Sequence, residues 1–303
     1  MAGKQRIYKQ KIRATGTLEK VFRAMELIAA SRIGKARDAA LGQDPYTRAL
    51  TASIATVAAH AHADHPLVRE RKDTNRVIVF VVTSDRGMAG AYSSSVLREA
   101  DKLLADLRGQ GKEPVLFVSG RRGDSHFRFH GIPVEKSWVG DSDKPKDATS
   151  REIAHLFLDL FLAPAEAGGV SELHVVSSKF VSMVSQVVEI RRMLPLEVVD
   201  AGAELSQHLD DGVDDSAPLY EFEPSAQEVF DALLPMYIGQ RVHSVMLMSA
   251  AAELAARQQA MHSATENAHE LIEKYTRLAN NARQAEITTE ITEIISGADA
   301  LGK

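Results

Sequence analysis

Apolar side chains recur at helical spacing in the first part of the chain. From about Leu18 to Ala59 they fall three and four residues apart, which places them on one face of a helix. Gly42 and Pro45 are expected to interrupt this amphipathic helix before a second helical stretch. Residues 60–75 follow; they are rich in charged side chains and contain Pro66, which indicates a connector.

The middle of the chain changes to short, continuous apolar runs. Residues 77–82 read Val-Ile-Val-Phe-Val-Val, a run typical of a strand that is buried on both faces of a sheet. Strand-like and helix-like segments then alternate, with strands expected at 114–119 and 173–176, helices at 93–107 and 151–162, and an edge strand at 186–193. This order predicts a parallel sheet flanked by helices.

The last part of the chain has the composition of one long helix. Residues 240–296 contain neither glycine nor proline, so a single rod of roughly 80–85 Å is expected. Small and apolar residues form a stripe near the 3.5-residue period, which requires a partner helix. The stripe consists of Ile238, Val242, Val245, Ser249, Ala252, Ala256, Ala260, Ser263, Asn267 and Leu271.

The other long helix is the N-terminal one, so the economical fold is an antiparallel coiled coil of the two ends. We therefore predict an α/β protein in which a Rossmann-like domain is inserted between the helices. The expected boundaries are an N-terminal helix over 1–60, the α/β domain over 61–200, an acidic loop or foot over 201–224, and the long C-terminal helix over 225–303.

Composition excludes several classes of protein. The 303 residues carry 36 basic and 41 acidic side chains, a net charge of −5 that does not suit a nucleic-acid binder. The absence of cysteine excludes disulfides, thiolate metal sites and cysteine nucleophiles. No apolar run approaches the length of a signal peptide core or a membrane span, so a cytoplasmic or peripheral membrane protein is expected.

The turn at residues 84–91, Ser-Asp-Arg-Gly-Met-Ala-Gly-Ala, lies where a strand passes into a helix and where a phosphate could bind. It lacks both the P-loop and the complete dinucleotide fingerprint. A tight turn held by Gly87 and Gly90 is the better interpretation.

His60, His62 and His65 lie beside Asp64 at a spacing that could supply metal ligands, although solvated histidines at a helix end explain them as well. No serine occupies a nucleophile elbow, and no catalytic triad can be assembled from the sequence. The chain is therefore an unconvincing enzyme, and no catalytic, cofactor or metal site is predicted.

The end of the long helix combines polar and apolar side chains. Arg283, Gln284 and Thr288 lie close together on its surface. Beyond them Ile287, Ile291, Ile294 and Ile295 fall where the partner helix should have ended. This apolar tip should contact another protein.

Three segments together resemble the gamma subunit of F-type ATP synthases. Residues 19–32, EKVFRAMELIAASR, are similar to the family's T-x-K-I-T-K-A-M-E-M-V-A-A-S-K segment, and residues 84–90 are similar to S-D-R-G-L-C-G. On the long helix, residues 237–239, 260–268 and 283–291 match the family's pattern in order and spacing. The departures, such as Phe22, Met88 and His262 in place of threonine, leucine and lysine, leave the fold intact.

The resemblance implies a central rotor shaft that couples proton-driven rotation of a membrane c-ring to ATP synthesis, or the reverse. One copy would turn inside three alpha and three beta subunits, which bind ATP, ADP and magnesium, while epsilon and the c-ring meet the other end. The protein would lie on the cytoplasmic face of the membrane, peripheral to it. The residues implied in ring contacts are Met25, Arg283, Gln284, Thr288, Ile287, Ile291 and Ile295, and those on the c-ring and epsilon side are Asp210, Asp211, Asp214, Asp215 and Tyr220.

Two alternatives remain open from the residues alone. An α/β enzyme could bind a phosphorylated ligand at residues 84–91 and use its helices to dimerise. A structural adaptor could self-associate through the 240–296 helix. The driving ion, the size of the c-ring and the preferred direction of the reaction are not encoded in this chain.

Overall fold

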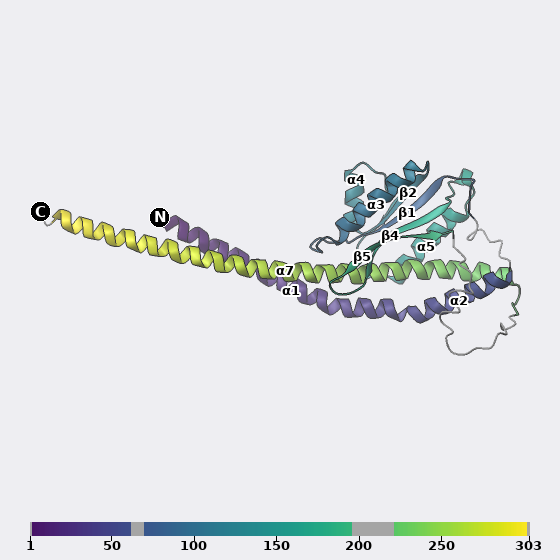
Figure 1. The fold of residues 1–303 in the computed structure, drawn as a ribbon, viewed down its shortest axis with the longest axis horizontal. Coiled ribbons are helices and arrows are strands. Elements are labelled where there is room, and N and C mark those ends of the chain that lie inside the picture. Colours follow the sequence, from purple (N-terminus) through teal and green to yellow (C-terminus); the bar gives the residue numbers. More distant parts are fainter. Residues whose placement is uncertain (1, 62–69, 196–220, 302–303) are drawn as a thin grey trace. The chain divides into compact units, whose positions relative to one another are not determined.

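A computed structural model describes residues 2–61, 70–195 and 221–301 of the chain (Figure 1). These residues form two compact units. The first unit combines 1–31 with 257–303, and the second spans 32–256. Two helices, α1 (Ala2–Gly42) and α7 (Ala226–Leu301), contribute to both units.

The second unit is built on a five-stranded mixed sheet. Its strands are β1 (Arg76–Val82), β2 (Glu113–Ser119), β3 (Lys136–Trp138), β4 (Glu172–Phe180) and β5 (Gln186–Leu194), in the order β3-β2-β1-β4-β5. β1 lies in parallel between β2 and β4, while β5 pairs with β4 in antiparallel fashion. The expected edge strand is confirmed, and its direction makes the sheet mixed instead of wholly parallel.

Alternate residues of β1 face opposite layers of helices. Val77, Val79 and Val81 pack against α3 (Tyr92–Gly109) and α4 (Arg121–Phe129). Ile78 and Phe80 pack on the other face, against α5 (Asp147–Leu162) and the first part of α7 (Figure 1). Because both faces are covered, the strand needs the unbroken apolar sequence seen in residues 77–82.

A one-turn 3-10 helix, η1 (Ala165–Ala167), precedes β4.

The beginning of α7 is a core helix of this unit. Phe230, Leu234 and Ile238 have no exposed surface and share one apolar cluster with Phe157 of α5. The helix therefore starts at Ala226, fourteen residues before the glycine- and proline-free run that begins at Gln240, and continues through Pro235 and Gly239. Burial of this apolar face compensates for the backbone hydrogen bond that proline removes.

The N-terminal helix, expected over 1–60, is divided into two helices. It begins at Ala2, and its break falls at Gln43, between Gly42 and the start of α2 (Asp44–Ala61). The side-chain amide of Gln240 donates to the side-chain oxygens of Gln43 and Thr47, at 2.7 and 3.2 Å. The predicted interruption is thus confirmed, and α7 holds it by polar contacts.

Within the first unit α1 and α7 run antiparallel. Tyr8 stacks on Tyr275 at 6.3 Å between ring centroids, while Glu26 lies near His262, so residue numbers rise in one helix as they fall in the other. Met261, Ala268 and Ala279 are buried apolar residues of α7 in this unit. The predicted stripe is wrong from Ser263 onward, because Ser263, Asn267 and Leu271 are exposed.

A buried histidine connects α5 to α7 in the second unit. The His243 ring nitrogen Nδ1 lies 2.8 Å from the hydroxyl of Ser150, which is fully buried. Burial lowers the pKa of His243, the Asp147 carboxylate acts in the opposite direction, and the Arg151 cation lowers the pKa as well. The imidazole therefore stays neutral in the native core.

We expect this histidine to make the second unit less stable in acid. Because its native pKa lies below the unfolded value of about 6.5, the unfolded chain binds more protons as the pH falls below that value, and stability is lost by at most about 1.4 kcal/mol per pH unit. Urea midpoints at pH 7.5 and 5.5, followed by Trp138 fluorescence, should differ less in His243→Gln than in the parent. His155→Gln, at an exposed position of α5, is the control, and equal pH dependence in parent and His243→Gln would refute this role.

Candidate interaction surfaces

The end of α7 presents an apolar surface to solvent. α1 begins at Ala2, about two turns before the Tyr8–Tyr275 contact. About five turns of α7 therefore extend beyond the first residue of α1. Ile287, Ile291, Ile294 and Ile295 are 44%, 51%, 71% and 57% exposed. The predicted unpartnered tip is confirmed for the described part of the chain.

Polar side chains lie on the same turns of α7. Arg283, Gln284 and Thr288 are all exposed. The Thr288 hydroxyl donates to the Gln284 carbonyl at 2.9 Å, a bond within the helix that leaves its oxygen able to accept another. This surface can therefore combine apolar contact with a few directed hydrogen bonds.

A second exposed apolar stripe follows α1 in the first unit. Leu18, Val21 and Ile28 are 51%, 47% and 54% exposed, and half-buried Met25 lies among them at spacings of three and four residues. Ala29, one turn after Met25, is buried at the edge of this stripe. The helix thus leaves an apolar stripe exposed beside its buried residues.

The turn at residues 84–91 borders a cavity of about 460 Å³ at the carboxyl end of β1. Gly90 and Met88 adopt positive φ angles of 55° and 60°. The prediction is confirmed for Gly90 and wrong for Gly87, since Met88 takes the left-handed conformation instead. The Ser84 hydroxyl lies 2.7 Å from that of Ser93, so it is already paired. The open cavity wall includes Phe129, which is 86% exposed.

Asp85 holds the loops around this turn together. Its carboxylate accepts backbone N–H bonds from Arg121 at 3.1 Å, Gly140 at 2.8 Å and Ser142 at 2.9 Å. The neighbouring Asp143 pairs with Arg32 of α1 at 2.6 Å. No local sequence pattern indicates this arrangement, because the donors are backbone groups from distant parts of the chain. Asp85 therefore shapes the carboxyl edge of the sheet and joins it to α1 through one loop.

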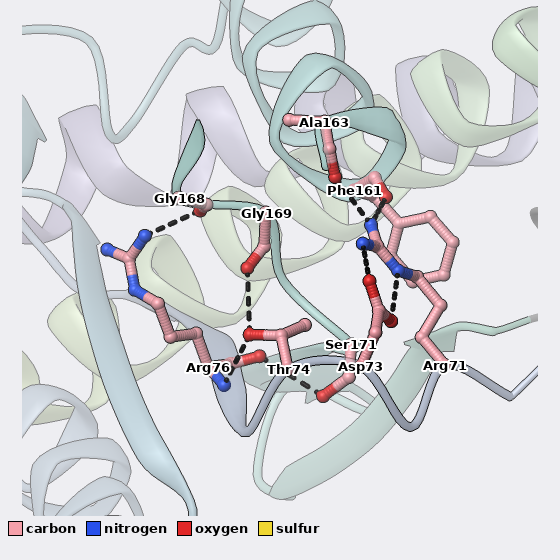
Figure 2. Close-up of polar contacts among 9 residues, drawn as sticks. All are labelled: Arg71, Asp73, Thr74, Arg76, Phe161, Ala163, Gly168, Gly169 and Ser171. Carbon is pink, nitrogen blue, oxygen red and sulfur yellow. Dashed lines mark hydrogen bonds and ion pairs between the residues drawn. The ribbon is translucent and has the colours of Figure 1, made fainter. Parts of the chain in front are cut away.

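Arg71 anchors the chain where it enters β1 (Figure 2). Its guanidinium forms two bonds to the Asp73 carboxylate, at 3.1 and 2.6 Å, and donates to the carbonyls of Phe161 and Ala163 at the end of α5. The bond from Arg71 lowers the pKa of Asp73. A cation at a helix C-terminus is favourable. The contact of Arg71 therefore holds the end of α5 beside the segment that leads into β1.

Thr74 and Arg76 extend the same anchor toward β4 (Figure 2). The Thr74 hydroxyl donates to the Gly169 carbonyl at 3.1 Å, and Arg76 donates to the carbonyl of Gly168. The Ser171 hydroxyl returns a bond to the Arg76 carbonyl at 3.1 Å. These contacts support the sheet at the start of β1 and β4.

Several predicted positions lie outside the described residues. These are the foot residues Asp210, Asp211, Asp214, Asp215 and Tyr220, together with His62, Asp64 and His65 of the histidine cluster. Among the described residues no group of three acidic, histidine or cysteine side chains could hold a metal ion. In the same part of the chain, no helix is both long and apolar enough to cross a membrane.

Comparison with known proteins gives a consistent result over the whole chain. Residues 4–301 match the family model described as ATP synthase. The ATP synthase gamma chain of Beutenbergia cavernae is 58% identical over 99% of both chains, and that of Arthrobacter sp. strain FB24 is 50% identical over the same shares.

Solved structures share the fold at low sequence identity. A chain of the Euglena gracilis mitochondrial ATP synthase, from the OSCP/F1/c-ring structure, has a TM-score of 0.64 at 15% identity and covers 99% of this chain and 95% of its own. A chain of the Tetrahymena thermophila central stalk/c-ring structure has a TM-score of 0.56 at 19% identity and covers 80% and 99%.

Proposed function

The chain belongs to the family of ATP synthase gamma chains, and on that premise we propose that it is the central rotor shaft of an F-type ATP synthase. One copy turns inside a ring of three alpha and three beta subunits and couples proton-driven rotation of a membrane c-ring to their conformational cycle. The observation that carries this proposal is the apolar tip of α7, which extends beyond its partner helix and is exposed.

The tip suits a shaft that must turn within a sleeve. Four isoleucine side chains held in water are unfavourable, so the tip favours an apolar environment provided by another protein. An apolar surface can exchange one set of contacts for another as it turns, whereas breaking a buried ion pair costs about 3–5 kcal/mol. Ile287, Ile291 and Ile295 are the bearing residues of this proposal.

Polar groups beside the isoleucines distinguish one angular position from another. Arg283, Gln284 and Thr288 are exposed on the turns that lead into the tip. A hydrogen bond to a charged group contributes about 1.5–3 kcal/mol, enough to favour one state of the ring over the next. Met25, within the second apolar stripe on α1, would contact a beta subunit.

The remaining parts of the proposal concern partners and place. ATP, ADP and magnesium are bound by the alpha and beta subunits, and this chain has no catalytic site of its own. Epsilon and the c-ring meet the foot, whose proposed contacts Asp210–Asp215 and Tyr220 lie outside the described residues. The protein sits at the cytoplasmic face of the membrane as a peripheral subunit.

Substitution of the polar residues tests the coupling role. Arg283→Ala and Gln284→Leu should each slow ATP turnover of the assembled complex by about tenfold or more, the factor that corresponds to the loss of one charge-assisted bond. Turnover is measured on complexes purified with intact subunit composition. Arg108→Ala, an exposed arginine at the end of α3, is the matched control. Unchanged turnover in both tip variants would remove these residues from coupling.

A further inference from the structure

The cavity of about 460 Å³ at the carboxyl ends of β1 and β2 has a basic lining. Small-molecule sites typically have volumes of roughly 300–1,000 Å³, so this space suits a ligand of modest size. The turn at residues 84–91 forms one wall, while α3 and α4, which lie together on one face of the sheet, form the others (Figure 1). The basic side chains of the lining are Arg86, Arg122, His126 and His130. This lining favours an anion.

The sequence of α4 places its contribution on one face of the helix. The residues of α4 that line the cavity are separated by three or four positions, the spacing of neighbours on a helix surface. They are Arg122, Ser125, His126, Phe129 and His130. One helix therefore carries a guanidinium, a hydroxyl and three rings along the same wall.

Arg122 is held against the turn at residues 84–91. Its backbone N–H donates to the Ser84 carbonyl at 3.0 Å, and a Cβ built on Gly87 would lie 3.5 Å from its Nη2. Arg86 belongs to the turn itself and also lines the cavity. Guanidinium groups stay charged in proteins, and their planar fork matches the oxygens of a phosphate. The walls thus carry two permanent positive charges suited to a phosphate.

The first turn of α3 adds backbone donors to the same cavity. Ala91 precedes this helix and supplies no side-chain cap, and the first amides of a helix have no carbonyl partner within it. Ser93 and Ser94 line the cavity, but the Ser93 hydroxyl is paired with Ser84 and the Ser94 hydroxyl donates to the Ala91 carbonyl at 3.0 Å. The contribution of this turn therefore comes from its amides and the positive end of the helix dipole.

The acids around the cavity are engaged elsewhere. The Asp85 carboxylate accepts three backbone N–H bonds, Asp101 lies 3.1 Å from Nε2 of His126, and Asp124 pairs with Arg128 at 2.9 Å. Among the described residues, no aspartate or glutamate lines the cavity. The electrostatic potential inside it is therefore set by the guanidinium groups and the start of α3.

Aromatic rings form the outer wall of the cavity. Phe129 is 86% exposed, and its ring meets that of His130 edge to face at 5.4 Å between centroids. The His130 ring lies 4.3 Å from the ring of His126, one turn earlier on α4. An exposed aromatic face is favourable for stacking with a flat ligand ring. A ligand that joins an anion to a flat ring would use both parts of the lining.

We propose that this cavity binds a phosphorylated small molecule with a flat ring, of the size of a nucleoside monophosphate. The phosphate contacts Arg86, Arg122 and the first amides of α3, and the ring stacks on Phe129. The turn lacks the glycine pattern that cradles a chain of phosphates, so a single phosphate is the better fit. Binding involves no covalent step, and it does not depend on the shaft role proposed above.

An NMR titration of the full-length chain with AMP tests this site. With histidine labelled by carbon-13 and the pH held constant, the ring signals of His126 and His130 should shift and saturate, with a dissociation constant of about 1 mM or lower. The signals of His243, buried between α5 and α7, should not move. Adenosine and inorganic phosphate, which each lack one half of the ligand, should bind at least about tenfold more weakly. The absence of saturable shifts with AMP would overturn the proposal.

A pair of arginine variants separates a built site from general charge attraction. Arg122→Ala should weaken AMP binding by about tenfold, because a charge-assisted contact to the phosphate is lost. Arg108→Ala removes the same charge from an exposed position at the end of α3, outside the cavity lining, and should change the affinity by less than about twofold. Equal weakening in the two variants would refute a specific phosphate site.

Phe129→Ala tests the ring half of the ligand. This side chain is exposed, so its removal should leave the fold intact. Binding of AMP should weaken by about fivefold or more through the loss of stacking, while binding of inorganic phosphate should stay the same. Unchanged AMP affinity would contradict the proposed class of ligand.

Discussion

Replacing Phe230 by alanine is expected to lower the free energy of unfolding of the second unit by about 3–5 kcal/mol. The Phe230 ring has no exposed surface and packs in the cluster that includes Leu234, Phe157 and Phe80. Its removal would leave a cavity between α7 and the sheet, which the surrounding rings cannot fill without leaving their rotamers.

The chain supplies its own probe for this measurement. Trp138 is the only tryptophan, is 8% exposed, and belongs to the same cluster as Phe230. Urea unfolding followed by its fluorescence should show the loss for Phe230→Ala, whereas Met236→Ala, at a half-exposed position of α7, should change stability by less than about 1 kcal/mol. Equal small losses in both variants would mean that α7 is not part of this core.

Gly120→Ala is expected to destabilise the same unit by about 3 kcal/mol or more. Gly120 has a φ of 98°, and a Cβ built there would lie 2.2 Å from the carbonyl oxygen of Thr83. Thr83 cannot retreat easily, since it is fully buried and its amide bonds to the Ser119 carbonyl at 2.7 Å. The close approach of the chain after β2 to the chain after β1 requires glycine at this point.

Gly131→Ala is the matched control for this substitution. Gly131 also has a positive φ, 68°, but a Cβ there would meet open space, so about 1–2 kcal/mol of backbone strain is expected. The difference between the two variants, measured by Trp138 fluorescence in urea, isolates the close approach. Similar losses for the two glycines would show that contact with Thr83 is not what constrains Gly120.

Much of the fold could be predicted because the strongest patterns were local. Residues 77–82 could only be a buried strand, and the glycine-free run after Gln240 could only be a long helix. The elements that were missed, α4, β3 and η1, are short, and α4 contains Gly123 among charged residues. Gly123 is required there because a Cβ would lie 2.7 Å from a Val118 methyl group, a reason visible only in the packed structure.

The register of the helix pair could not be predicted from spacing. The sequence suggested one continuous seam from Ile238 to Leu271, yet Ser263 and Asn267 are exposed while Met261 and Ala268 are buried. A spacing near 3.5 residues predicts which face of α7 contacts a partner helix. Which of two neighbouring lines of residues on that face is buried depends on the side chains of α1. Cysteine cross-links within one chain should therefore join the Met25 region to the His262 region.

The candidate surfaces could likewise be predicted where they depend on neighbouring residues in the sequence, and not where they depend on contacts between distant segments. The isoleucine tip could be predicted because a helix longer than its partner must leave its end uncovered. The second stripe on α1 was found by its spacing, which begins at Leu18 and includes Met25, but the pattern could not reveal that Leu18, Val21 and Ile28 are exposed. The role of Asp85 depends on amides from two loops, so no local pattern could have revealed it.

Native mass spectrometry of this chain co-expressed with the alpha and beta subunits tests the shaft proposal most directly. The account predicts a complex that contains one copy of this chain with three alpha and three beta subunits, because the tip of α7 should fit inside a single ring. A homodimer of the chain that binds neither subunit would contradict it and would return attention to the cavity beside residues 84–91.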